Sequence, residues 1–71
     1  MYLSQGKIGK MYKIKNIFLE RKIKNRLWVL GMTKETNVKI LNKNFNGALI
    51  LKVRGTRFAI CKDISNSIII N

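Results

Sequence analysis

The hydrophobic residues of this chain follow two different periods, and the first of them is the alternation of a strand. In residues 10–17, Tyr12 and Ile14 alternate with lysines. After one interruption the alternation resumes at Phe18, which places Phe18 on the same inward face. We therefore predict a first, half-buried strand over residues 10–17, with Tyr12, Ile14 and Phe18 facing the core and Ile17 facing outward.

The period changes to that of a helix in residues 19–30. One apolar stripe, at about 100° per residue, contains Leu19, Ile23, Leu27 and Leu30. Gly31 follows at once, and a left-handed closing residue is favoured there because glycine has no Cβ to clash. We predict one amphipathic helix that ends at Gly31. Trp28 lies off the stripe, so it either packs against a neighbouring loop, which a small core favours, or leaves an apolar spot on the surface.

Four further short strands are predicted in the second half of the chain. Their inward-facing residues are Val38 and Ile40, then Leu49, Leu51 and Val53, then Phe58 and Ile60, and finally Ile68 and Ile70. Residues 42–47 predict a hairpin, residues 54–56 a tight turn, and residues 63–67 a short helical turn. The fold class is therefore mainly β with one α-helix, a small closed or nearly closed β-barrel of about five strands. A single domain would span residues 1–71, with residues 1–9 as an irregular lead.

Length and composition restrict the chemistry that this chain can perform. Its 71 residues leave a thin core and little space for an enclosed catalytic cavity. Histidine is absent, Cys61 is the only cysteine, and the acids are Glu20, Glu35 and Asp63. Zinc sites need about four ligands, and a hydrolase needs a nucleophile with a positioned base. We expect no catalytic residues, no metal site and no cofactor, so the protein is not predicted to be an enzyme.

Neither a secretion signal nor a membrane span is indicated by the sequence. The first apolar residues are soon followed by polar ones and by Lys7. The longest uncharged apolar stretch, residues 27–32, is far shorter than the ~20 residues of a membrane helix. We expect a cytoplasmic protein.

The net charge of +12 would attract nucleic acid, anionic lipid or an acidic protein surface. The lysines are scattered rather than gathered in one block, and enrichment in Lys, Ile and Asn together also follows from AT-rich codons, so a solvated surface is favoured over a dedicated nucleic-acid patch. Base stacking needs exposed aromatic residues, but Phe58 is predicted to face inward and Phe45 lies in a hairpin. A small basic nucleic-acid-binding barrel remains the alternative function.

Two strings stand in a characteristic order. Residues 26–32 read Arg-Leu-Trp-Val-Leu-Gly-Met, and residues 53–60, which follow an alternating strand and Gly47, read Val-Arg-Gly-Thr-Arg-Phe-Ala-Ile. In this order and spacing, across about residues 6–70, the chain resembles the FeoA family. The chain departs from the family at Lys34 and Glu35, where the family often has Pro-Gly, and at Gly47 and Ala48, where its hairpin usually includes a longer Gly-Asp-Pro-like piece.

The resemblance implies an SH3-like barrel without catalytic activity that belongs to ferrous iron transport. Its implied partner is a FeoB-type ferrous iron transporter with a GTP-binding domain, so the protein would reach the membrane only through that partner and would bind no specific nucleic acid. Transition metal ion binding is associated with the family, but this chain offers only three acids and Cys61, which is predicted to face outward on the fourth strand, and these cannot build a good iron site.

Structural and contact roles can be assigned to a few residues. Gly31 and Gly55 are expected to permit sharp turns, and Met32 to close the barrel as a hydrophobic contact. Aromatic, Met and Arg side chains are enriched at the centres of protein contacts. The candidate partner-binding residues are therefore Trp28, Met32, Arg54 and Arg57.

Overall fold

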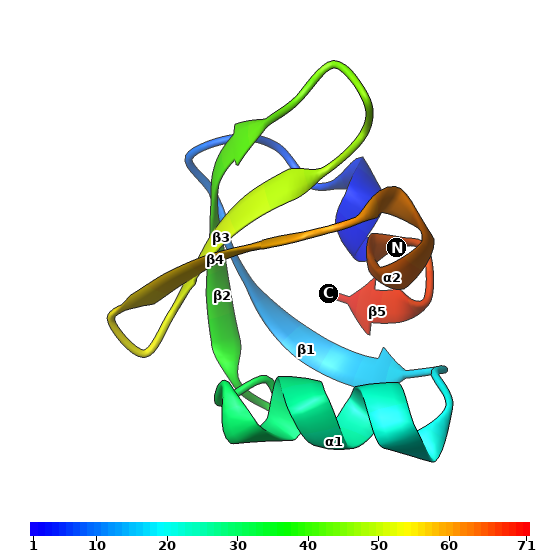
Figure 1. Cartoon of the computed structure of the whole chain (residues 1–71). Helices are drawn as coiled ribbons and strands as arrows, with labels where there is room; N and C mark the ends of the chain where they lie inside the picture. The colour runs from blue at the N-terminus through cyan, green and yellow to red at the C-terminus, as the bar shows by residue number, and fades with distance from the viewer.

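Five antiparallel strands form one strongly curved sheet in the computed structural model, which describes residues 1–71 (Figure 1). The strands are β1 (Met11–Ile17), β2 (Asn37–Lys43), β3 (Leu49–Val53), β4 (Thr56–Ile60) and β5 (Ile68–Ile70). The helices are η1 (Leu3–Gln5, a 3-10 helix), α1 (Arg21–Val29) and α2 (Lys62–Ser65). The predicted mainly-β class, with about five strands and one principal helix, is confirmed.

The sheet is open between its two outer strands. Its order is β4-β3-β2-β1-β5, so β4 and β5 are not paired with each other, and α2 connects them. The free side of β5 is covered by the start of the chain, because Tyr2 pairs with Ile69 and the Ile70 N–H donates to the Met1 carbonyl at 2.8 Å. Only β4 keeps an uncovered edge, so the barrel is nearly closed rather than closed.

The core lies inside the curve of the sheet and is built from alternate strand residues. Thirteen buried residues form one hydrophobic cluster. On β3 the three predicted inward residues, Leu49, Leu51 and Val53, have no exposed surface. Lys52, between two of them, points to solvent. The period-two pattern therefore predicted the inner and outer faces of this strand correctly.

The first residues contribute more to the fold than an irregular lead would. Leu3 is fully buried in the core, and η1 turns the chain around it. The turn is held because the Gln5 N–H donates to the Tyr2 carbonyl at 2.9 Å and the Tyr2 N–H donates to Gln5 Oε1 at 2.8 Å. The short apolar run that ends at Leu3 has too few residues to show a period, so the sequence pattern did not reveal this contact.

The inward face of β1 differs from the prediction at its end. Ile17 is buried, whereas Phe18 is 61% exposed. The pairing of β1 with β5 shifts register between Ile14 and Asn16, which is the signature of a β-bulge. One extra residue at the bulge moves every later side chain to the opposite face, so Phe18 was assigned to the wrong side.

The C-terminal end of α1 is closed as predicted, by a Schellman motif at Gly31. Gly31 has φ +95, and its N–H donates to the Trp28 carbonyl at 3.0 Å. The Met32 N–H donates to the Leu27 carbonyl at 2.9 Å, and both of these side chains are buried together in the core. Met32 closes the barrel end, while Leu30, predicted to extend the buried stripe, is exposed. No helix of the chain has the length and hydrophobicity needed to cross a bilayer.

The turn between β3 and β4 is a two-residue hairpin turn. Its central residues, Arg54 and Gly55, both have positive φ angles, +52 and +82. Val53 and Thr56 pair on either side of them. This is the geometry of a type I′ turn, whose twist matches that of the flanking strands. The turn predicted at residues 54–56 is confirmed, and Gly55 supplies the conformation that it requires.

Candidate functional site

Three consecutive apolar side chains are exposed at the C-terminal end of α1. Trp28 is 67% exposed, Val29 84% and Leu30 41%. Leu27 takes the one fully inward position of this helical turn, so its neighbours along the chain are directed away from the core. We call Trp28, Val29 and Leu30 the helix-end patch. The favoured interpretation of Trp28 as a packed residue was wrong, since its ring lies at the surface.

A small hollow lies beside the Trp28 ring. Its lining includes Ile17, Lys24, Trp28, Met32, Thr33 and Lys34. Met32 is fully buried, so its side chain supports the hollow from beneath and belongs to the core rather than to the exposed surface. Two lysines stand at the hollow, so the apolar patch borders on positive charge. An aromatic side chain beside basic groups is a common composition for a protein contact.

A second candidate surface is a row of residues across the outer face of the sheet. The strand register places Met11 opposite Lys39, Lys39 opposite Lys52, and Lys52 opposite Arg57. Like charges directly opposite one another on antiparallel strands repel. A groove runs along part of this row, and its lining includes Met11, Glu35, Asn37, Lys39, Lys52 and Arg54. We call it the cationic groove.

Arg54 lies between the two surfaces. A Cβ placed on Gly31 would be 3.2 Å from the Cδ of Arg54, so the arginine side chain lies directly against the end of α1. The carbonyl end of a helix carries partial negative charge, which favours a cation there. Trp28 and Arg54 are therefore brought to the same end of α1, whereas Arg57 lies on the sheet, beside Lys52. The four residues chosen from the sequence do not form one cluster.

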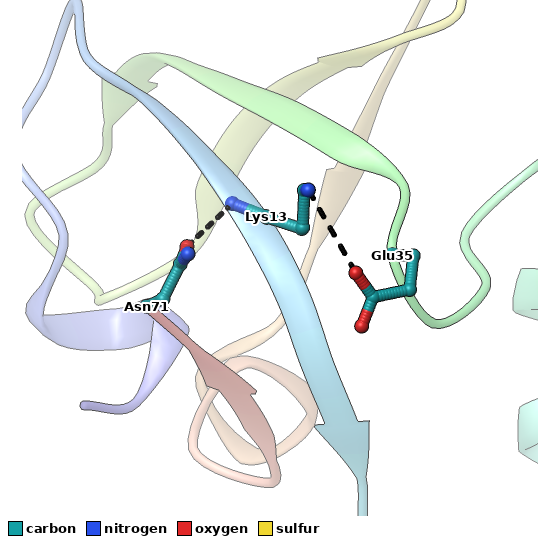
Figure 2. A network of polar contacts seen from close by, with 3 residues as sticks. All are labelled: Lys13, Glu35 and Asn71. Atoms are coloured by element: carbon teal, nitrogen blue, oxygen red, sulfur yellow. Dashed lines mark hydrogen bonds and ion pairs between the residues drawn. The ribbon is translucent and has the colours of Figure 1, made fainter.

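Glu35 is the acidic residue at the cationic groove, and it is held by its neighbours (Figure 2). Its Oε2 lies 3.7 Å from the Nζ of Lys13 in the protein's one ion pair. The Lys13 N–H donates to the Asn71 Oδ1 at 3.0 Å, as Figure 2 shows. The Lys13 carbonyl also accepts a hydrogen bond from the Asn71 N–H at 3.2 Å. Glu35 also has φ +69. It therefore has the left-handed backbone that a glycine in this turn would adopt easily.

Replacing Glu35 with glycine is expected to raise the free energy of unfolding by about 0.5–1 kcal/mol, because glycine carries no Cβ penalty at positive φ. Glu35→Gln is the control for the lost charge and should change stability by less than about 1 kcal/mol, since exposed ion pairs contribute little. Urea unfolding followed by circular dichroism would measure both. If the Glu35→Gly variant is less stable than the Glu35→Gln variant, the turn is not strained.

The remaining candidate chemistry is sparse. Cys61 is exposed, as expected, but it follows β4 and stands before α2 rather than on the strand itself. No group of three or more His, Cys, Asp or Glu side chains is placed to hold a metal ion. The helix-end patch and the cationic groove are exposed surfaces, and both offer contact with another molecule.

A curved five-stranded sheet with one helix at its end defines a small SH3-like domain. The chain belongs to the FeoA family, because its residues 1–71 match the FeoA domain throughout. This membership places it among the proteins of ferrous iron transport.

Solved structures agree with this assignment. The FeoA protein from Chlorobium tepidum is 21% identical with a TM-score of 0.93, and the match covers 100% of this chain and 69% of that one. An iron uptake regulatory protein (FeoA) is 25% identical with a TM-score of 0.90, covering 100% and 95%.

A third structure carries a functional description. FeoA from Stenotrophomonas maltophilia, complexed with zinc, is 25% identical with a TM-score of 0.83, covering 100% of this chain and 89% of that one. It is described as a prokaryotic SH3 domain protein and a candidate activating factor for bacterial ferrous iron transport. No curated protein matches this chain.

Proposed function

We propose that this protein is a non-catalytic accessory protein of ferrous iron uptake that binds the GTP-binding part of a FeoB-type transporter. It would act in the cytoplasm without a cofactor and reach the membrane only through that partner. The observation that carries the proposal is the helix-end patch, three exposed apolar residues in a row on a chain that matches the FeoA domain over its whole length.

The helix-end patch has the properties of a contact centre. Tryptophan is among the residues that contribute most to binding when a partner covers them. The patch is also held in a fixed place, because the Schellman hydrogen bonds close the end of α1 and the buried Leu27 and Met32 side chains anchor it to the core. A preorganised surface loses little conformational entropy when it binds, so more of the contact energy is left for affinity.

Charge supports the same function without specifying it. The net charge of +12 steers the protein toward negatively charged surfaces and accelerates encounter with them. Lys24 and Lys34, which line the hollow beside Trp28, extend this positive field to the patch itself. We therefore expect an apolar contact at Trp28 whose surroundings on the partner are acidic.

Replacing Trp28 with alanine is expected to weaken binding to the transporter by about tenfold, because a large aromatic contact is lost. The measurement is titration of the detergent-solubilised transporter, and of its isolated GTP-binding domain, with labelled protein. Phe45→Ala is the matched control, since Phe45 is a fully exposed aromatic residue at the tip of the β2–β3 hairpin, away from the patch.

Two outcomes would count against the proposal in different ways. If Trp28→Ala and Phe45→Ala bind as tightly as the wild type, the transporter is bound but the helix-end patch is not the contact. If the wild-type protein binds neither the GTP-binding domain nor the whole transporter, the proposed function itself is wrong.

A further inference from the structure

We propose that the cationic groove binds an acidic segment of a protein partner, with carboxylates seated on Lys39, Lys52 and Arg54. The ligand chemistry follows from the groove alone. Only the identity of the partner rests on the proposed function, in which the acidic segment would belong to the transporter.

The three cations of the groove, Lys39, Lys52 and Arg54, form no ion pair within the protein. Lys39 and Lys52 face each other across the β2–β3 pair, and Lys52 faces Arg57 across the β3–β4 pair. Such like-charge pairs destabilise a sheet. Glu35 is the one acid in the lining, and its carboxylate pairs with Lys13, which is not a lining residue, rather than with Lys39, Lys52 or Arg54. An anionic ligand laid along this row would reduce the repulsion between the cations. Carboxylate binding is therefore favoured both by direct attraction to the cations and by relief of this repulsion.

Backbone strain is concentrated at the same place. Glu35 and Arg54 are the only residues other than glycine with positive φ, and both line the cationic groove. Arg54 stands at the first central position of a type I′ turn, where asparagine before glycine would fit better. Strained residues that persist in a fold are found preferentially at binding and catalytic sites. The structure thus keeps a guanidinium at this position although the turn alone would favour another residue.

The lining distinguishes between classes of ligand. The groove has a volume of about 580 Å³, but only one of its eight lining residues, Met11, is hydrophobic, unlike the apolar pockets of small-molecule sites. None of the eight is aromatic, so the groove lacks the stacking platform that single-stranded nucleic acid uses. Glu35 in the lining would repel a uniformly negative surface such as a phospholipid layer. A peptide can place its carboxylates on the cations and leave a neutral residue at Glu35.

The experiment is fluorescence anisotropy of a labelled peptide of alternating Glu and Ala, with a Gln and Ala peptide as the neutral reference. Lys39→Gln combined with Lys52→Gln should weaken binding of the acidic peptide at least about fivefold. The matched control combines Lys22→Gln with Lys62→Gln, which removes the same charge from exposed positions on α1 and α2 and should cost less than about twofold.

A third variant separates binding from folding. Arg54→Asn supplies the residue that the type I′ turn prefers, and this gain offsets the lost contact of the arginine with the end of α1. The melting temperature should therefore change little, whereas the loss of a carboxylate partner should weaken peptide binding about threefold or more. If this variant binds as tightly as the wild type, Arg54 is not a ligand of the acidic segment and the assignment is overturned.

The remaining outcomes are also decisive. Equal losses in the Lys39/Lys52 and Lys22/Lys62 variants would show that net charge, not the groove, binds the peptide. Tighter groove-dependent binding of single-stranded RNA, or of phosphatidylglycerol vesicles, would overturn the peptide proposal in favour of those ligands. Transporter binding that depends on Trp28 but is unchanged in the Lys39/Lys52 variant would leave the proposed function intact. It would refute the proposal that the groove binds an acidic segment of the transporter.

Discussion

Replacing Leu51 with alanine is expected to lower the free energy of unfolding by about 3 kcal/mol, because a fully buried side chain on a central strand would leave a cavity. Leu51 pairs with Ile40 on β2 and with Phe58 on β4, so both neighbouring strands lose contacts. A domain of this size has a total stability on the order of 5–10 kcal/mol, and the variant would keep only part of it. Urea unfolding followed by circular dichroism measures the loss.

The control for Leu51 is the next residue, on the opposite face of the same strand. Lys52→Ala should leave stability unchanged or slightly raised, because it removes a lysine that faces both Lys39 and Arg57. A comparable loss for Lys52→Ala and Leu51→Ala would contradict the assignment of inner and outer faces on β3.

Replacing Gly31 with alanine is expected to cost about 2 kcal/mol, from two separable causes. The first is the left-handed backbone at φ +95, which costs a non-glycine residue roughly 1–2 kcal/mol. The second is the new Cβ, which would lie 3.2 Å from the Arg54 Cδ and displace that side chain. Thermal and urea unfolding of the variant would measure the sum.

Gly9→Ala isolates the backbone cause. Gly9 has φ +86, and a Cβ there would meet no atom within 4 Å, so this variant should cost about 1 kcal/mol. In an Arg54→Asn background, Gly31→Ala should approach the same value. If Gly31→Ala costs no more than Gly9→Ala when Arg54 is present, the new Cβ does not clash with the Arg54 side chain and the second cause is refuted.

Local patterns in the sequence were sufficient for most of the fold. The alternation of Leu49, Leu51 and Val53 and the helix end at Gly31 were both predicted correctly. Each of them depends only on near neighbours along the chain. Phe18 was misplaced because the bulge in β1 depends on pairing with β5, which no local pattern contains. Leu3 was missed for the same reason, since its burial is decided by distant residues.

The candidate surfaces were harder to predict from the sequence than the fold. Lysines 39 and 52 are adjacent only because β2 and β3 pair in one particular register, and Arg54 reaches the end of α1 only after the sheet has curved. Trp28 was expected to pack because small cores need large side chains, yet its place after Leu27 on the helix directs it outward. One local signal for the groove did exist. Glu35 stands where the FeoA family often has glycine, and it has the positive φ angle that glycine adopts easily.

The position of β5 sets the order in which this chain can fold. Strands β2, β3 and β4 follow one another, so they can form as local hairpins over short loops. The pairing of β1 with β5 instead joins distant segments: the Lys13 N–H bonds to a side chain 58 residues further on. Closing so long a loop carries an entropic penalty before any contact compensates it, and non-local pairing slows folding. We expect the meander of β2, β3 and β4 to form early and the pairing of β1 with β5 to be the slow, final step.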